Sequence, residues 1–228
     1  MRATAVVPAY NEEDVIADTV GALLQLEGVA RVIVVDDASL DDSAGLAALA
    51  GATVVVNGEN LGKGGSLNRV LDGLDFEALL LIDGDLGNCA AEAGLLLDAV
   101  LGGEADLAIA AFPPPAHKGG FGIAQGLARG GIKALSGLQM RSPISGQRAM
   151  TRGVFDAVSP LREGFGVEVA MTLDAHRAGF KVVEVPTQMS HNETGRDMAG
   201  FVHRGRQFAD IARALASRAL ERGGRPCR

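Results

Sequence analysis

Four short apolar runs stand out in the first half of the chain, and none of them alternates with polar residues. They cover residues 4–7, 32–35, 54–56 and 79–82. Continuous runs of this length, rich in Val, Leu and Ile, are typical of strands buried on both faces, as in a parallel sheet. We therefore predict four parallel strands before residue 83.

Segments with helical periodicity separate these runs. In 14–26, one helical face holds Ile16, Val20, Leu23 and Leu24, and Asn11 stands just before this segment in an N-cap position. The next helices are expected at 41–50 and 64–74. Strands that alternate with helices predict an open α/β sheet with right-handed crossovers.

The second half is less regular. The segment 112–122 contains three prolines and three glycines, so it is either a connector or a lid over an active site. We find no internal repeat and no linker, which favours one domain. Further helices are expected at 91–101, 123–138 and 164–178, strands at 107–111 and 181–185, and a last helix whose apolar face holds Phe208, Ile211, Ala212, Leu215 and Ala219.

Charge is distributed unevenly. Residues 1–100 hold 17 acidic and 4 basic residues, whereas residues 101–228 hold 11 acidic and 17 basic ones. The asymmetry is either a chance distribution of solvated faces or an acidic half that holds a cation beside a basic half that meets anions. An acidic sheet side and an aromatic content of 4% argue against nucleic-acid binding.

The chain carries no pattern of export or membrane insertion. Cys89 and Cys227 do not form a disulfide framework, so we expect a reducing, cytoplasmic compartment. No signal peptide is visible, and no apolar run approaches the roughly 18 residues of a membrane span. We expect a soluble protein, with peripheral contact at the inner face of a membrane left open.

Polar residues follow each of the four predicted strands. They lie at 8–12, 36–39, 57–63 and 83–85, and the carboxyl edge of an open α/β sheet is where ligands bind. No glycine-rich phosphate loop follows the first strand, which argues against a dinucleotide oxidoreductase or a P-loop enzyme. Asp83 and Asp85 flank Gly84, so both carboxylates could bind one Mg²⁺ or Mn²⁺; alone, this triplet would more often be a turn.

The four segments VVPAYNE (6–12), VVDDAS (34–39), NLGKG (60–64) and DGD (83–85) together resemble the family-two, GT-A-fold glycosyltransferases. The resemblance implies an open, mostly parallel α/β sheet flanked by helices. It also implies a metal-dependent transfer of sugar from a nucleotide diphosphate donor, a UDP or GDP sugar, with Mg²⁺ or Mn²⁺. The single domain 1–228 would comprise a nucleotide-sugar-binding half, 1–111, and an acceptor-side half, 112–228, with a basic C-terminal helix.

The resemblance implies roles for residues in these segments. Asp36 would meet the base or ribose with Asp37 supporting it, although Asp37 could instead be a capping or turn acid. Glu12 could equally be a solvated acid of a first helical turn. Asp85 would bind the metal and act in catalysis, with Asp83 near the ribose or the metal. The residues expected to bind the donor are Pro8, Ala9, Tyr10, Glu12, Asp36, Asp37, Lys63, Asp83 and Gly84.

Two later segments resemble acceptor-side motifs of the family: SGQRA (145–149) and GFGVE (164–168). Glu168 would serve as the general base, or bind acceptor hydroxyls if the acceptor is already a phosphate anion. A solvated helix acid is the alternative. His191 follows the 184–186 segment as in glucosyl-3-phosphoglycerate synthases, where a histidine here joins the metal; a loop histidine is the other interpretation.

Basic residues near the C-terminus suit a phosphate. Arg196, Arg204 and Arg206 could hold the donor diphosphate or an acceptor phosphate. A basic amphipathic helix on an anionic membrane, or a helix that simply packs on the domain, would also fit. The chain resembles both polyprenyl-phosphate glycosyltransferases and phosphoglycerate synthases, so the acceptor is expected to bear phosphate.

Two rival functions remain. A nucleotidyltransferase should carry a glycine-rich basic loop after its first strand, where this chain has PAYNEE. A non-catalytic nucleotide-sugar-binding protein would be expected to have lost an acid of the 83–85 triplet, and both are present. A homodimer is also left open.

Overall fold

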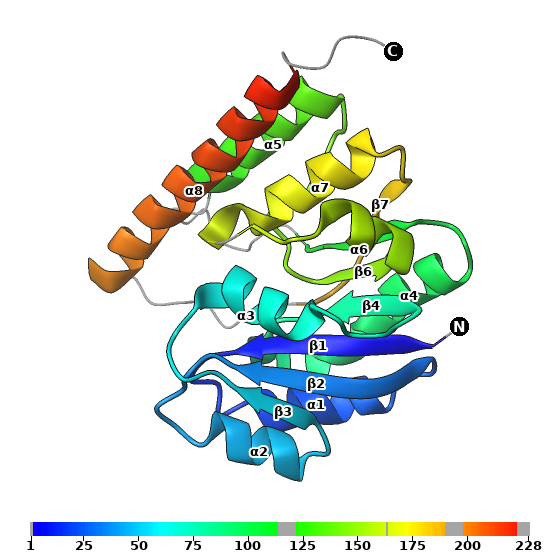
Figure 1. Ribbon diagram of the computed structural model, residues 1–228, viewed down its shortest axis with the longest axis vertical. Helices are drawn as coiled ribbons and strands as arrows, with labels where there is room; N and C mark the ends of the chain where they lie inside the picture. The colour runs from blue at the N-terminus through cyan, green and yellow to red at the C-terminus, as the bar shows by residue number, and fades with distance from the viewer. Residues whose placement is uncertain (1, 114–121, 163, 190–197, 223–228) are drawn as a thin grey trace.

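The computed structural model describes residues 2–113, 122–162, 164–189 and 198–222. Its centre is a seven-stranded sheet of order β3-β2-β1-β4-β6-β5-β7 (Figure 1). All neighbours pair in parallel except β6, which is antiparallel to both β4 and β5. The strands are β1 Ala3–Ala9, β2 Val29–Asp36, β3 Thr53–Val56, β4 Ala78–Leu81, β5 Leu107–Ala111, β6 Arg148–Thr151 and β7 Val182–Pro186.

Helices cover both faces of this sheet. One core joins α1, α2 and α4 to the sheet, and the other joins α3, α5, α6, α7 and α8 to the opposite face. The α-helices are α1 Ile16–Leu24, α2 Ser43–Leu49, α3 Gly62–Leu71, α4 Ala93–Leu101, α5 Gly122–Ser136, α6 Arg152–Val158, α7 Val167–Arg177 and α8 Met198–Arg222, and the 3-10 helices are η1 Gly84–Glu92 and η2 Gly164–Gly166.

The mostly parallel α/β fold expected from the sequence is confirmed. The four predicted strands are present, each within a few residues of its expected bounds. Strands β1, β4 and most of β2 are buried as expected, whereas β3 lies at the edge of the sheet and its Val56 is 55% exposed. Strand β6 and helix α6 were not predicted. The sequence of β6, RAMT, has no apolar run, and it becomes a strand because β4 and β5 pair with it from both sides.

Asn11 is not the N-cap of α1, so that prediction is wrong. The cap position belongs to Val15, which makes no side-chain capping bond. Asn11 has φ +57°, a left-handed conformation that Asn tolerates better than most residues. Its side-chain oxygen accepts a bond of 2.8 Å from the backbone N–H of Leu40, so Asn11 ties the loop after β1 to the loop after β2.

Helix α8 runs beside α5, where the orange-to-red and green ribbons lie together in Figure 1. Its buried face contains Ile211, Ala214 and Leu215. Phe208 is 41% exposed and Ala219 is exposed, so the apolar face predicted from periodicity is only partly correct. No helix in the described part of the chain is long and apolar enough to cross a membrane.

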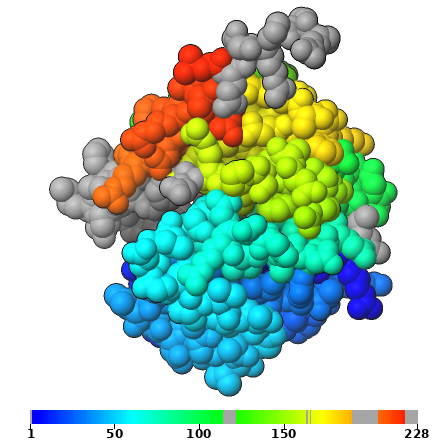
Figure 2. All heavy atoms as spheres, viewed as in Figure 1, coloured from blue at the N-terminus to red at the C-terminus, as the bar shows by residue number. Residues whose placement is uncertain are grey.

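The two halves of the chain adjoin along one surface. Figure 2 shows the blue-to-cyan N-terminal residues on one side and the yellow-to-red C-terminal residues on the other. Strand β6 of the second half lies between β4 and β5 in the sheet, so the halves share a backbone ladder. The single-domain boundary 1–228 stays a prediction.

Candidate active site

The predicted donor segments meet at the carboxyl edge of β1, β2 and β4. Gly84 follows β4 and lies against the end of β1: a Cβ on it would stand 3.3 Å from Ala9 Cβ and 3.4 Å from Glu12 Cγ. The 83–85 triplet is therefore packed on the PAYNEE segment, and its role at a metal stays a prediction. Pro8 is half-buried, and Tyr10 is 44% exposed at the same edge.

Hydrogen bonds join the loop after β1 to the loop after β2. The backbone N–H of Asn11 donates to Ser39 Oγ over 2.9 Å, and that of Glu12 donates to Ser43 Oγ over 2.7 Å. Ala38 has φ +63°, which is unusual for a residue with a Cβ. Strained backbone of this kind often persists where neighbouring contacts fix a functional loop.

Asp37 anchors the loop that leads into α3. Its two oxygens accept bonds of 2.7–2.8 Å from the Asn57 amide, the Ser66 hydroxyl and the backbone N–H groups of Leu61 and Gly62. Burial alone would raise the pKa of this carboxyl, but the four donors outweigh it and lower the pKa. Asp37 is thus a loop-anchoring acid at the start of α3, which fits the capping alternative, and its supporting role toward a donor stays a prediction.

Asp36 is equally buried but poorly paired. It is 2% exposed, and its Oδ2 accepts a single bond of 3.2 Å from the backbone N–H of Ser39. Its Oδ1 is buried and has no hydrogen-bond partner among the described residues. Buried polar atoms are rarely left unpaired, so this oxygen is where a ligand donor would be favourable.

Lys63 connects the donor half of the chain to the acceptor half. Its Nζ lies 2.6 Å from Asp83 Oδ1 and 3.0 Å from Glu168 Oε1, although Glu168 is 105 residues away in sequence. Burial would lower the pKa of the Lys63 ammonium, but the two carboxylates outweigh it and raise the pKa. Lys63 therefore stays charged, and Glu168 is a buried, ion-paired acid at 8% exposure.

Gly146 covers this ion-paired cluster closely. A Cβ at Gly146 would clash with both Asp83 Oδ2 and Lys63 Nζ. The next residue, Gln147, donates from Nε2 to Asp83 Oδ2 over 2.9 Å. The segment 145–149 therefore touches the aspartate triplet directly, and both oxygens of Asp83 are engaged from other segments.

Negative charge is concentrated beside Asp85. Burial, together with smaller contributions from the repulsion of Asp85, Asp83 and Asp41, raises the pKa of Glu12 to about 7. A carboxylate cluster that suppresses its own ionisation in this way suits a hard divalent cation, which would relieve the repulsion. Within the described residues no three metal-ligating side chains already stand in a ready-made cluster.

Several predicted site residues are not placed here. His191 and Arg196 lie outside the described residues, and the side chain of Arg204 does too. Arg206 is described and exposed on α8. Their roles at the metal and at phosphate stay predictions.

Gln147 and Arg148 belong to the site, but the sequence assigned neither residue a role of its own; it pointed only to the segment 145–149. Arg148 is fully buried, and burial lowers the pKa of its guanidinium to about 10, although Glu168, Glu184 and Asp83 partly offset that effect. No apolar run or periodicity singles it out in the sequence, because its strand, RAMT, has no apolar pattern. Only its place in the segment 145–149 marked it.

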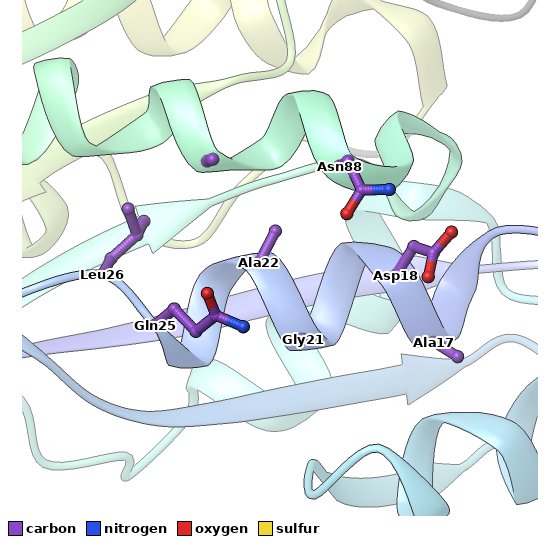
Figure 3. Close-up of a pocket in the computed structure, with 8 residues that line it drawn as sticks. Ala17, Asp18, Gly21, Ala22, Gln25, Leu26 and Asn88 are labelled. Carbon is purple, nitrogen blue, oxygen red and sulfur yellow. The ribbon is translucent and has the colours of Figure 1, made fainter.

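A separate groove lies between α1 and η1, with a volume of about 430 Å³ (Figure 3). Asp18, Gln25 and Asn88 are its polar lining residues, and Asp18 is the titratable one. None of the predicted site residues lines this groove. The candidate active site is therefore the carboxylate and lysine cluster at the sheet edge, not this groove.

The chain is similar to several known proteins. Residues 4–155 match the sequence profile of glycosyl transferase family 2. Glycosyltransferase AglJ of Haloferax volcanii is 31% identical over 194 residues, which cover 83% of this chain and 63% of AglJ. The chain therefore spans less than two thirds of the length of that relative.

Two further proteins are similar over more of their length. Polyprenol monophosphomannose synthase of Mycolicibacterium smegmatis is 29% identical over 214 residues, which cover 85% of this chain and 79% of the synthase. Glucosyl-3-phosphoglycerate synthase of Mycobacterium tuberculosis, crystallised with Mn²⁺, UDP and glucosyl-3-phosphoglycerate, superposes with a TM-score of 0.78. It is 26% identical and covers 95% of this chain and 79% of its own.

Proposed function

Because the chain belongs to glycosyl transferase family 2, we propose that it transfers a sugar from a nucleotide diphosphate sugar to a phosphate-bearing acceptor, with Mg²⁺ or Mn²⁺. The observation that carries the proposal is the contact of Lys63 with both Asp83 and Glu168. It joins the motif residues of the donor half to the acidic motif of the acceptor half. The relatives support it, since they are glycosyltransferases by name and one was crystallised with Mn²⁺ and UDP.

Of the two expected donors, UDP fits the base site better than GDP. Asp36 offers one unpaired oxygen, Oδ1, while Ser39 already occupies its other oxygen. Uracil presents one ring N–H, which needs one acceptor. Guanine presents a ring N–H beside an amino group and is best recognised by two free oxygens of a carboxylate. The structural relatives were also crystallised with UDP.

The metal would be held at Asp85, with Asp83 beside it. Since Lys63 and Gln147 already bind the oxygens of Asp83, we assign Asp85 the direct contact and Asp83 a supporting one. The bound cation would neutralise the diphosphate as it leaves. His191 remains a proposed third ligand.

The transfer forms a bond between an acceptor oxygen and the anomeric carbon, and it breaks the bond from that carbon to the donor phosphate. The nucleoside diphosphate leaves with the bonding electrons. An acceptor phosphate attacks through an oxygen that is already ionised, so no base is required, and Glu168 then holds acceptor hydroxyls. If the acceptor oxygen is a hydroxyl, Glu168 is the group in reach to take its proton.

The acceptor phosphate is assigned to the basic side of the site. Arg196, Arg204 and Arg206 come from the segment that precedes or begins α8, and arginine forks bind phosphate well. The named relatives make different products: one is a polyprenol monophosphomannose synthase and one a glucosyl-3-phosphoglycerate synthase. A polyprenyl phosphate acceptor would place the protein at a membrane surface, and a phosphoglycerate would not.

Donor binding is the first test. Thermal stabilisation by UDP, GDP and their sugars is measured with and without Mn²⁺ on the wild type, on Asp85→Ala and on the control Asp18→Ala. Stabilisation by a UDP compound that needs both Mn²⁺ and Asp85, and that Asp18→Ala retains, supports the proposal. No stabilisation of the folded wild type by any of these donors would refute it.

Acceptor use is the second test. The donor that binds is incubated with polyprenyl phosphate in detergent or with 3-phosphoglycerate, and the glycosylated product is identified by mass spectrometry. A product with one acceptor selects that acceptor class. Hydrolysis of the donor without transfer to either compound would reject a phosphate-bearing acceptor.

A further inference from the structure

Arg148 lies at the start of β6, and its buried guanidinium makes no direct ion pair with a described residue. The side chain is 0% exposed, and no ion pair among the described residues includes it. One of its nitrogens, Nη2, is buried without a hydrogen-bond partner there. A buried charge that Glu168, Glu184 and Asp83 only partly offset is destabilising, and an apolar side chain of similar volume would often be more stable. Fold stability therefore does not explain an arginine here.

The two bonds that Arg148 makes lead to two different segments. Its Nε donates to the backbone oxygen of Ser145 over 2.9 Å, which fixes the turn before β6. Its Nη1 donates to Thr172 Oγ1 over 2.9 Å, and that hydroxyl donates in turn to the backbone oxygen of Glu168 over 2.8 Å. One guanidinium thus ties the 145–147 segment to the first turn of α7.

These two segments supply the acceptor-side contacts to the ion-paired cluster. From the first, Gln147 donates to Asp83 over 2.9 Å; from the second, Glu168 accepts from Lys63 over 3.0 Å. We propose that Arg148 is a positioning residue that holds Gln147 and Glu168 in register with Asp83 and Lys63. The inference rests on the proposed function, because its consequence is the rate of sugar transfer.

The base site proposed for the donor depends on other contacts. Asp36 ends β2 and Asp37 follows it, and the hydrogen-bond donors to their two carboxylates come from residues 39–66. None of these partners contacts Arg148. Loss of the guanidinium should therefore lower kcat and leave the Kd for the nucleotide diphosphate with Mn²⁺ unchanged.

Arg148→Met keeps the length and apolar stem of the side chain and removes its two bonds. We expect kcat to fall about 100-fold, the loss that a displacement of about 1 Å at a reacting group can cause. Thr172→Val removes only the link to Glu168 at nearly constant volume, so its loss of kcat should be smaller. The double variant should be no slower than Arg148→Met alone, since both act through one chain of bonds.

Arg218→Met is the matched control. Arg218 also binds α7, but through Asp174, away from the cluster. It should lower the melting temperature while kcat is retained. If Arg148→Met and Arg218→Met lose kcat in proportion to their loss of stability, or if Kd for the nucleotide rises as kcat falls, Arg148 has only a structural role and the inference is overturned.

A second readout separates this inference from the proposed function. If the wild type transfers no sugar, the proposed function fails, and positioning is measured by the side-chain amide NMR signal of Gln147, assigned by its loss in Gln147→Glu. A shift of that signal in Thr172→Val but not in Arg218→Met supports positioning. An unchanged signal in Thr172→Val refutes it, and this isosteric variant carries the test even if Arg148→Met does not fold.

Discussion

Asp36 and Asp37 are adjacent and both buried, yet the structure predicts opposite consequences for their conversion to asparagine. Asp37 accepts four hydrogen bonds, three on Oδ1 and one, from the backbone of Gly62, on Oδ2. Asp37→Asn can keep an acceptor oxygen for the first three. It turns the second oxygen into an amino group that faces the N–H of Gly62, so that bond is lost.

The size of the effect follows from these contacts. A buried donor left without a partner costs about 1–3 kcal/mol, and each remaining bond loses the roughly 1 kcal/mol by which a charged acceptor exceeds a neutral one. With three remaining bonds, the expected loss is about 4–6 kcal/mol of unfolding free energy. For a chain of about this size, 1 kcal/mol moves Tm by about 2–4 °C, so Tm should fall by about 8–24 °C.

Asp36→Asn is the matched comparison. It disturbs one bond, from Ser39, and replaces a carboxylate whose Oδ1 has no partner among the described residues. Its unfolding free energy should change by less than about 1 kcal/mol. Its Kd for UDP with Mn²⁺ should rise, because the proposed acceptor for the uracil N–H is altered.

The pH dependence gives a second check on Asp37. Four donors lower the pKa of its carboxyl in the folded state despite burial, whereas the unfolded value is about 3.9. Its contribution to stability is therefore fully present above the unfolded pKa and is lost as pH falls through the lower folded pKa. The difference in unfolding free energy between wild type and Asp37→Asn should be constant near neutral pH and should narrow in acid.

Both quantities come from urea unfolding followed by circular dichroism at a series of pH values, with Tm from calorimetry. Equal destabilisation by Asp36→Asn and Asp37→Asn would contradict the assignment of Asp37 as the loop anchor. A stability difference that did not narrow in acid would contradict the lowered pKa.

Three further predictions concern the cluster itself. Gly146→Ala should abolish most transfer activity in a steady-state assay, because the new Cβ would clash with Lys63. Its effect on stability to urea should be much smaller, and full activity would contradict the close contact. Lys63→Met removes the cation between two carboxylates, so UDP binding with Mn²⁺ should weaken in calorimetric titration, and an unchanged Kd would exclude the proposed role of the lysine. Asp85→Asn removes a charge that repels the Glu12 carboxylate, so the pKa of Glu12 should fall below its value of about 7. A ¹³C carboxyl titration without metal measures it, and an unchanged pKa would contradict the repulsion between the two groups.

The amino-acid sequence determined the N-terminal half of the sheet. Its four strands are continuous apolar runs separated by helices, so their order along the chain already implied a parallel sheet. Once that sheet was implied, residues that directly follow each strand had to gather at one edge. Asp36, Asp83 and the PAYNEE segment could be placed there because their positions depend only on where each strand ends.

Only the tertiary structure decided how the acceptor half completes the site. Strand β6 has no apolar pattern and exists because β4 and β5 pair with it. The bond from Lys63 to Glu168 spans 105 residues, and the bond from Gln147 to Asp83 spans 64. Local periodicity records which face of an element is apolar. It does not record which distant segments pack together, and the burial of Arg148 depends on that packing alone.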